Sequence, residues 1–445
     1  MKLNALLDVD VLALQQDDQL TCLLRIDAPI PPDTAHRPGE TVVVVVDRSG
    51  SMHGAPLEAV RSSLHALVDR VKPQDTFGVV VFDNSAAIAV PARKMADHHV
   101  GTVHQLIDGI ESGGSTDLSG GYLLGLSEAR RCTGATGATL LLLSDGHANA
   151  GIVDPFQVGK VAAQARDERI TSTTIGIGAG YDELLLNQIA TQGSGSHRFA
   201  FTPDDAAAVV SEEAGDLLSK AAVNAFVRIK PTDPALVPGI GTLHGVARWV
   251  ETDASGDEVV VIPLGDLYAG EQRELLVHFD VPGIEALGLH TLATLTIDYV
   301  ALPDLASEQV TWPMSVNVVP GDEAAGRIPN PTVTTARLLA ETTQAKHDAS
   351  EALMHGDSGK AERLMDEQAA RLRLALAGID DSMPGADALR MRLSEESQQL
   401  SKLSRGAREQ VAPLMAKSMM EDWAMESRGR NDQARRNRSR NKRDF

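Results

Sequence analysis

The sequence predicts an α/β domain with a doubly wound, mostly parallel sheet, inserted in or joined to an antiparallel β-sandwich and followed by a C-terminal helical region. Between residues 39 and 222, apolar runs alternate with segments of helical spacing, which is typical of parallel strands joined by crossover helices. From 223 to 320, apolar and polar residues alternate with period two. That alternation favours antiparallel strands with one solvated face.

The α/β domain begins with a run of five valines at residues 42–46. Uniform β-branching without polar interruption is typical of a strand buried on both faces. Leu57, Val60 and Leu64 then recur at helical spacing and indicate a helix with one buried face. We predict strands at 42–46, 76–82, 138–143, 170–177 and 197–201, and helices at 56–71, 118–131, 154–165, 182–190 and 203–222.

The N-terminal residues 1–38 contain a strand at about 21–26 but are too few to form a domain alone. We expect this strand to pair with the later antiparallel sheet, which would make the α/β unit an insertion within a β-sandwich. In the sandwich region 223–320, Ala293, Leu295 and Ile297 alternate with polar residues and predict one buried face.

Residues 321–425 predict a linker and a helical hairpin or bundle, with helices at about 332–355, 359–377 and 386–412. We expect Ser358 to cap the second of these helices and Gly378 to end it. A heptad seam favours packing within the chain over a coiled-coil dimer because it spans only about three heptads. The seam consists of Leu389, Leu393, Leu400, Leu403 and Ala407.

The amino-acid composition of the chain argues against several classes of function. The 445-residue chain has a net charge of −20, which argues against a nucleic-acid-binding surface. The tail 426–445 is basic and lacks apolar periodicity, so we predict it to be disordered and the only segment suited to nucleic acid. Two cysteines in different elements indicate no disulfide framework, and no apolar run is long enough to span a membrane. By elimination, we expect a cytoplasmic protein.

Three segments carry side chains suited to binding a cation. Asp47, Ser49 and Ser51 occupy alternate positions where the valine strand ends, Thr116 lies in a loop before a helix, and Asp145 ends another apolar strand. In a doubly wound sheet, ligands bind outside the carboxyl ends of the strands, at the switch point. Oxygen ligands without cysteine or histidine favour Mg²⁺, with Mn²⁺ or Ca²⁺ as alternatives. An Asx turn with a helix cap would explain the first segment alone. It would not explain why Thr116 and Asp145 stand at the matching positions of two other segments.

These positions resemble the metal-ion-dependent adhesion site of von Willebrand factor A domains, also called integrin I-like domains. The family's site is written Asp-x-Ser-x-Ser, then Thr, then Asp, and all five positions match. Segments 75–82 and 176–183 are similar to bacterial members of the family, and segment 265–271 resembles what often follows such domains. The resemblance covers about residues 39–320 and implies a Rossmann-like fold. It also implies that the two serines and Thr116 coordinate the cation directly or through water, while the two acids ligate it or hold its waters.

The chemistry of such a site predicts binding rather than catalysis. Mg²⁺ with few protein ligands keeps several waters, so an aspartate or glutamate from a partner protein can replace one of them. We therefore expect a non-enzymatic, adhesion-type protein-interaction module without catalytic residues. Two alternatives remain open. Bacterial relatives often work beside AAA+ ATPases, which suggests a recruiting or regulatory subunit; a metal-dependent hydrolase is less favoured because no nucleophile elbow is present.

Overall fold

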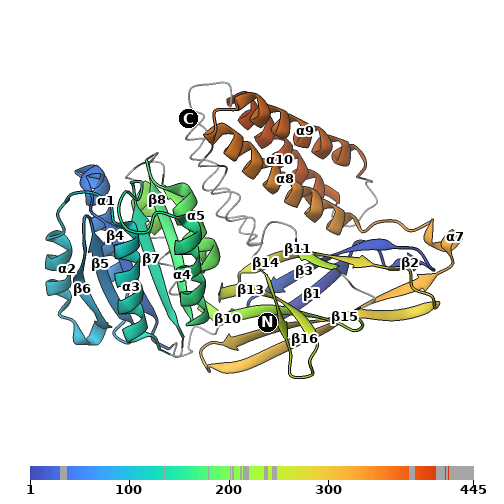
Figure 1. Ribbon diagram of the computed structural model, residues 1–445, viewed down its shortest axis with the longest axis horizontal. Helices are drawn as coiled ribbons and strands as arrows, with labels where there is room; N and C mark the ends of the chain where they lie inside the picture. The colour runs from blue at the N-terminus through green and yellow to red at the C-terminus, as the bar shows by residue number, and fades with distance from the viewer. Residues whose placement is uncertain are drawn as a thin grey trace.

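The structure is a computed structural model in which the chain forms an α/β unit, a β-sandwich and a group of long helices (Figure 1). In Figure 1 the α/β unit lies beside the sandwich, and the helices lie over the sandwich. The structure describes residues 1–30, 38–134, 136–178, 180–200, 202, 205–210, 213, 220–234, 239–242, 248–379, 386–406, 416 and 419.

The sheet of the α/β unit has the strand order β6-β5-β4-β7-β8-β9. All neighbouring pairs are parallel except β5 with β6, which is antiparallel. The strands are β4 (Thr41–Asp47), β5 (Thr76–Phe82), β6 (Ala86–Lys94), β7 (Ala138–Ser144), β8 (Ile170–Ile177) and β9 (Ser194–Ala200). Every residue of β4 is buried, as expected for the strand beside which the chain changes direction across the sheet.

The valine run of β4 contributes to two hydrophobic cores. Val42, Val44 and Val46 pack with α1 (Ala55–Val68) and α2 (Val100–Asp108) on one face of the sheet. Val43 and Val45 pack on the other face with helices α3 (Leu118–Cys132), α4 (Pro155–Asp167) and α5 (Glu183–Gln192). Helices on both faces of a mostly parallel sheet confirm the predicted fold class.

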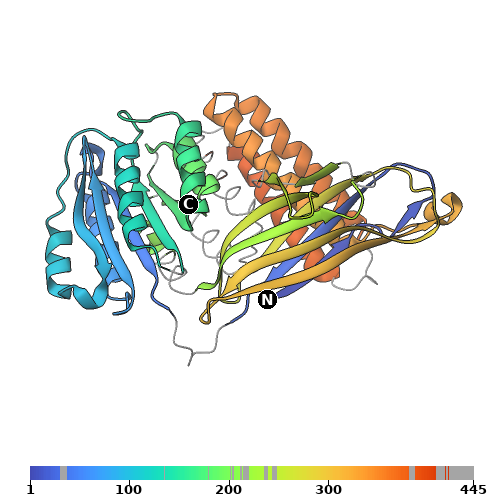
Figure 2. The same ribbon diagram turned by 60° about the horizontal axis from the view of Figure 1, so that its bottom comes forward.

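The β-sandwich consists of a sheet with order β1-β3-β14-β11 and a sheet with order β12-β13-β10-β15-β16-β2. The N-terminal strand β3 pairs antiparallel with β14, with Leu24 opposite Leu275, so the α/β unit is inserted in the chain of the sandwich. Figure 2 shows the blue N-terminal strands within this part of the molecule. The strands are β1 (Lys2–Leu7), β2 (Val11–Ala13), β3 (Asp18–Asp27), β10 (Lys220–Pro231), β11 (Gly239–Thr242), β12 (Trp249–Thr252), β13 (Glu258–Tyr268), β14 (Gln272–Val281), β15 (Gly288–Ala301) and β16 (Ala306–Val319).

A buried ion cluster joins the α/β unit to the sandwich at the amino ends of β4 and β7. The ammonium group of Lys220, at the start of β10, lies 2.8 Å from Asp266 Oδ2 and 3.4 Å from Glu40 Oε2. It also donates to Thr139 Oγ1 at 3.0 Å. Tyr268 of the sandwich packs into the core of the α/β unit. Segment 265–271 therefore forms part of the joint between the two units.

The long helices form a bundle within the chain. They are α8 (Pro331–Met354), α9 (Ser358–Ala377) and α10 (Ala386–Gly406), preceded by the short α7 (Gly321–Ala324). Helix α9 packs against both α8 and α10, and Leu393 and Leu400 are buried in their shared core. The start of α8 also packs on the sandwich, where Val333 contacts the cluster that includes Leu23 and Leu276.

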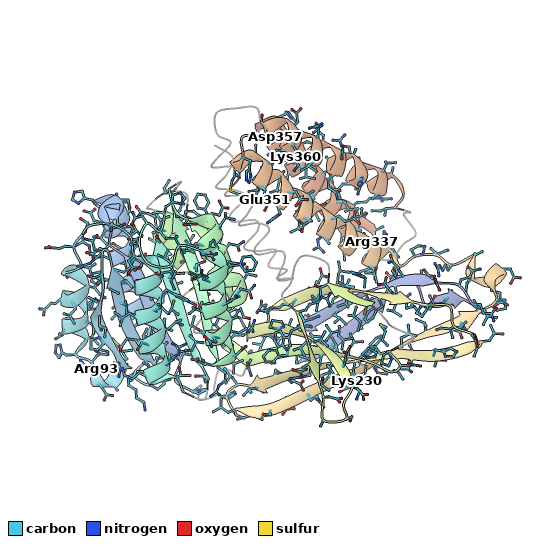
Figure 3. The ribbon with its side chains drawn as sticks, viewed as in Figure 1. Arg93, Lys230, Arg337, Glu351, Asp357 and Lys360 are labelled. Atoms are coloured by element: carbon cyan, nitrogen blue, oxygen red, sulfur yellow. The ribbon has the colours of Figure 1, made fainter. Side chains whose placement is uncertain are left out.

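Some predicted details were wrong. Asp357 rather than Ser358 caps α9, because its carboxylate accepts a hydrogen bond from Lys360 N at 2.9 Å (Figure 3). Residues 220–222 belong to strand β10 and not to the helix predicted at 203–222. Ala407 and the tail 426–445 lie outside the described residues. Among the helices that the structure describes, none combines the length and the apolar character needed to span a membrane.

Candidate metal centre

Asp47 ends strand β4 at the carboxyl edge of the sheet. Its side chain is fully buried. One carboxylate oxygen, Oδ1, accepts a hydrogen bond from Ser49 N at 2.8 Å, and Oδ2 accepts one from Ser144 Oγ at 2.6 Å. The contact with Ser49 N is an Asx turn of the kind that the sequence left open. It positions the segment after the strand, and within the described ranges no lysine or arginine pairs with the carboxylate.

Ser49 and Ser51 connect this turn to the end of β7. Ser49 is 2% exposed, and its Oγ lies 3.1 Å from Ser51 Oγ. Ser51 Oγ donates to Asp145 Oδ1 at 2.7 Å. Although Ser49 occupies the N-cap position of the short 3₁₀ helix at Gly50–Met52, its side chain makes no capping hydrogen bond. Both hydroxyls therefore face the neighbouring polar groups of the site instead of the helix.

Thr116 lies close to the other residues of the site, as the distances around Gly146 show. A β-carbon built on Gly146 would lie 3.4 Å from Ser51 Oγ, 3.4 Å from Thr116 Oγ1 and 3.9 Å from Asp47 Oδ2. Three oxygens from two distant segments thus converge beside one residue of a third segment that has no side chain. The structure brings together all five residues named from the sequence, at the edge where parallel strands present ligand sites.

The loop that carries Thr116 is held by two neighbours that the sequence did not single out. Asn149 Oδ1 accepts from Thr116 N at 2.9 Å, and Asn149 N donates to Thr116 O at 3.1 Å. On the other side, a β-carbon on Gly113 would lie 2.1 Å from Asp83 Oδ2, so this close approach requires glycine. Asp83 is itself paired with Arg48 at 2.9 Å.

The pKa values of the two acids of the site are higher than those of ordinary surface carboxylates. Burial raises the pKa of Asp47, against the lowering effect of its hydrogen bonds to Ser144 and Ser49. Burial also raises the pKa of Asp145 to about 6, and the nearby charge of Asp47 adds to that shift. In the described part of the chain, neither carboxylate has a lysine or arginine partner. Two adjacent carboxylates in this state are stabilised by a bound cation.

The donor set fits a hard divalent cation. Two carboxylates and three hydroxyls supply only oxygen, the ligand atom that Mg²⁺, Mn²⁺ and Ca²⁺ prefer. His147 follows Asp145 by two residues, but its side chain is 73% exposed and its Nδ1 lies 3.8 Å from Asp182. Sequence reasoning missed Ser144 and Asn149 as supports of the site. Ser144 could have been found from its position directly before Asp145, whereas nothing in the sequence distinguishes Asn149.

Sequence comparison identifies relatives of the chain. It is 27% identical over 252 residues to the uncharacterized protein YfbK of Escherichia coli, which covers 56% of this chain and 43% of YfbK. It is 26% identical over 261 residues to the uncharacterized protein sll0103 of Synechocystis, which covers 58% of this chain and 60% of sll0103. The chain therefore spans less than two thirds of the length of either relative.

Two solved structures share the fold of nearly the whole chain. A von Willebrand factor type A protein from Catenulispora acidiphila matches with a TM-score of 0.71 at 15% identity, over 96% of each chain. The ArnB paralog VWA2 from Sulfolobus acidocaldarius matches with a TM-score of 0.61 at 14% identity, over 96% of this chain and 97% of the other. Residues 41–213 match the family model of the von Willebrand factor type A domain. The α/β unit therefore has the fold of a von Willebrand factor type A domain, and residues 41–213 match that family in sequence.

Proposed function

We propose that this domain is a metal-dependent protein-interaction module. Asp47, Ser49, Ser51, Thr116 and Asp145 hold one Mg²⁺, with Mn²⁺ or Ca²⁺ as substitutes, and the ion binds an aspartate or glutamate side chain of a partner protein. The observation that carries the proposal is the convergence of these five oxygen-bearing side chains, whose two carboxylates have no lysine or arginine partner among the described residues. A divalent ion supplies the missing positive charge.

The position of the site favours an external ligand. Ser51 is exposed and Asp145 is half-buried, whereas Asp47 and Ser49 are buried. The site therefore has a closed inner side and an open outer side. Because Mg²⁺ requires about six oxygens and retains waters where protein ligands are few, the open side is where a partner carboxylate exchanges with water.

The hydroxyls favour binding over hydrolysis. Ser49 and Ser51 contact each other and Asp145, and among the described residues no histidine is hydrogen-bonded to either serine. A serine nucleophile requires such a base within hydrogen-bond reach. We therefore propose a non-enzymatic module, and a metal-dependent activity that is lost in Asp47→Ala would contradict that part of the proposal.

Calorimetric titration of the full chain with Mg²⁺ and Mn²⁺ tests the metal site directly. We expect one ion per chain in the wild type and, in Asp145→Asn, no measurable uptake at the Mg²⁺ concentrations that saturate the wild type. Glu111→Gln removes an exposed carboxylate that precedes the glycine-rich loop and serves as the matched control. Equal uptake by Asp145→Asn and the wild type would refute the site.

The partner arm uses the same variants as bait in pull-downs from lysate. A partner bound through the metal should be recovered with Mg²⁺, lost with EDTA and lost with Asp145→Asn. Substitution of that partner's exposed acids should then identify one carboxylate whose loss abolishes binding while leaving metal uptake by this chain unchanged. A partner that binds equally in all conditions would contradict metal-bridged capture.

A further inference from the structure

Two histidine–aspartate pairs face each other across helices α1 and α2. His65 is followed four residues later by Asp69 at the C-cap of α1, and His104 is followed four residues later by Asp108 at the end of α2. Residues four apart share one face of a helix. Because α1 and α2 pack side by side on the same face of the sheet, the two pairs meet at the surface of the α/β unit.

The contacts between these pairs cross from one helix to the other. His65 Nε2 lies 2.9 Å from Asp108 Oδ1, and His104 Nε2 lies 3.5 Å from Asp69 Oδ1. The two Nδ1 atoms face each other at 2.6 Å, with the ring planes inclined by 29° and their centroids 4.9 Å apart. The four side chains thus form a chain of contacts with an imidazole–imidazole contact at its centre.

This arrangement determines where the imidazole protons lie. An ionised carboxylate only accepts hydrogen bonds, so the ring nitrogen that faces each aspartate carries the hydrogen: His65 Nε2–H donates to Asp108 at 2.9 Å, and His104 Nε2 faces Asp69 at 3.5 Å. In the neutral rings the Nδ1 atoms then carry lone pairs, and these lone pairs point at each other. Two lone pairs at this separation repel unless a cation lies between them, which is either a shared proton or a metal ion.

We propose that His65 and His104 bind a transition-metal ion, of the class of Zn²⁺ or Cu²⁺, through their Nδ1 atoms. Asp108 and Asp69 act as the hydrogen-bond partners of the ligands, the arrangement that orients metal-binding histidines and raises their basicity. Tetrahedral Zn²⁺ with Zn–N distances of about 2.0–2.1 Å places its nitrogen ligands about 3.3 Å apart. The rings therefore need to separate by less than about 1 Å.

The surroundings accommodate the ion and its remaining ligands. The histidine side chains are 29% and 28% exposed, and the two aspartates are 68% and 69% exposed, so water can complete the coordination. Arg61 of α1 donates to the main-chain carbonyl of Asp108 at 3.2 Å. The carboxylate of Asp108 contacts His65 instead. Nitrogen ligands select a softer cation than the all-oxygen site at the end of β4.

The test uses the full chain with Asp145→Asn, which removes the oxygen site from the measurement. Titration with ZnCl₂ should show uptake of one ion, and electron paramagnetic resonance with Cu²⁺ should show hyperfine coupling to imidazole nitrogen. We expect His65→Gln combined with His104→Gln to lose this uptake and the nitrogen coupling. Asp108→Asn should weaken Zn²⁺ binding about 10–100-fold, and His290→Ala on the sandwich should change nothing.

Two results would overturn the proposal. One is a Cu²⁺ spectrum or a Zn²⁺ affinity that is unchanged in the double histidine variant. The other is the absence of Zn²⁺ and Cu²⁺ uptake in the protein with both histidines intact, which would assign the contact to a shared proton only. The second result needs no histidine substitution, so it remains decisive if the double variant does not fold.

Discussion

Two carboxylates lie at each end of strand β4, but among the described residues only the pair at the amino end contacts a lysine or arginine. At the amino end, Glu40 and Asp266 surround the ammonium group of Lys220. At the carboxyl end, Asp47 and Asp145 are surrounded by serine and threonine hydroxyls. The two ends are separated by one strand of seven residues.

This difference distinguishes a structural cluster from a binding site. Burial by itself lowers the pKa of Lys220, but the charges of Asp266 and Glu40 outweigh burial and leave that pKa raised, so the cluster is charge-compensated within the chain. At the other end, burial and the charge of Asp47 raise the pKa of Asp145 to about 6, and among the described residues no lysine or arginine pairs with either acid. Buried acids with an internal cation join two domains, whereas buried acids without one are suited to an external cation.

The largest expected effect comes from removing the internal cation. Lys220→Met should lower the free energy of unfolding by about 3–5 kcal/mol, because it removes the buried ammonium group that lies between the Glu40 and Asp266 carboxylates. Urea denaturation of the purified chain measures this loss. Lys230→Met is the matched control, since Lys230 lies at the sandwich surface (Figure 3) between Asp253 and Asp257. Equal stability of the two variants would mean that the cluster is not what joins the domains.

Next in size is the loss of one acid at the other end of β4. Asp145→Asn should weaken Mg²⁺ binding by about 100-fold or more, since affinity for a hard cation depends on the number of charged ligands. Without metal it should not lower the free energy of unfolding, because the raised pKa shows that the native surroundings disfavour the carboxylate. Thermal unfolding with and without Mg²⁺ measures both effects. A marked destabilisation in EDTA would show that Asp145 has a structural role instead.

A pH titration sharpens the same contrast. Below about pH 6 the Asp145 carboxyl is protonated, and a protonated acid does not bind metal, so Mg²⁺ affinity should fall about tenfold per pH unit there. In the metal-free protein the sign is opposite. A raised native pKa means that the native state binds more protons than the unfolded state, so Asp145 lowers stability as pH rises from about 4 to 6.

Calorimetry at stepwise pH tests the first trend, and denaturation in EDTA tests the second against Asp145→Asn. The variant should lose the stability change over pH 4–6 that belongs to Asp145. An affinity that stays constant between pH 7 and 5 would show that the ion does not bind through this carboxylate.

The smallest expected effect concerns the support of Thr116. Asn149→Ala removes the side-chain acceptor for Thr116 N and should weaken Mg²⁺ binding about two- to tenfold, the value of one hydrogen bond. Asn187→Ala on α5 offers a control of the same residue type away from the site. Calorimetric Mg²⁺ titration compares the two. A complete loss of binding in Asn149→Ala would indicate that Asn149 is itself a ligand.

The sequence predicted five of the six strands of the sheet and the five site residues because both depend on local patterns. The valine run of β4 and the motif at its end are contiguous, and Asp145 follows a run of four leucines. Strand order then brings strand ends together. The supports of the site were not predicted, since Ser144 with Asp47 and Asn149 with Thr116 are pairs separated by 97 and 33 residues. Metal binding by the five residues remains a prediction.

Strand β6 and helix α2, which lie within residues 86–108, were not predicted from the sequence. Strand β6 lies at the edge of the sheet, contains Pro91 and has several exposed positions, so it lacks the apolar run of a central strand. Helix α2 has nine residues, which is little more than two turns of periodicity. The cap of α9 was placed one residue late because Asp357 and Ser358 are adjacent and both are favourable caps. Geometry, and not residue type, decides between them.

The insertion of the α/β unit has a mechanical consequence. The chain enters β4 at Glu40 and leaves toward the sandwich at Lys220, and both positions lie at the same end of the sheet. A partner bound at the metal site pulls on the carboxyl end of β4, while the sandwich holds its amino end. A force between them would stretch β4 along its axis. Tension would then act as shear on the hydrogen bonds that β4 makes with β5 and β7 on its two sides, the direction in which a central strand resists separation because all of its bonds are loaded together.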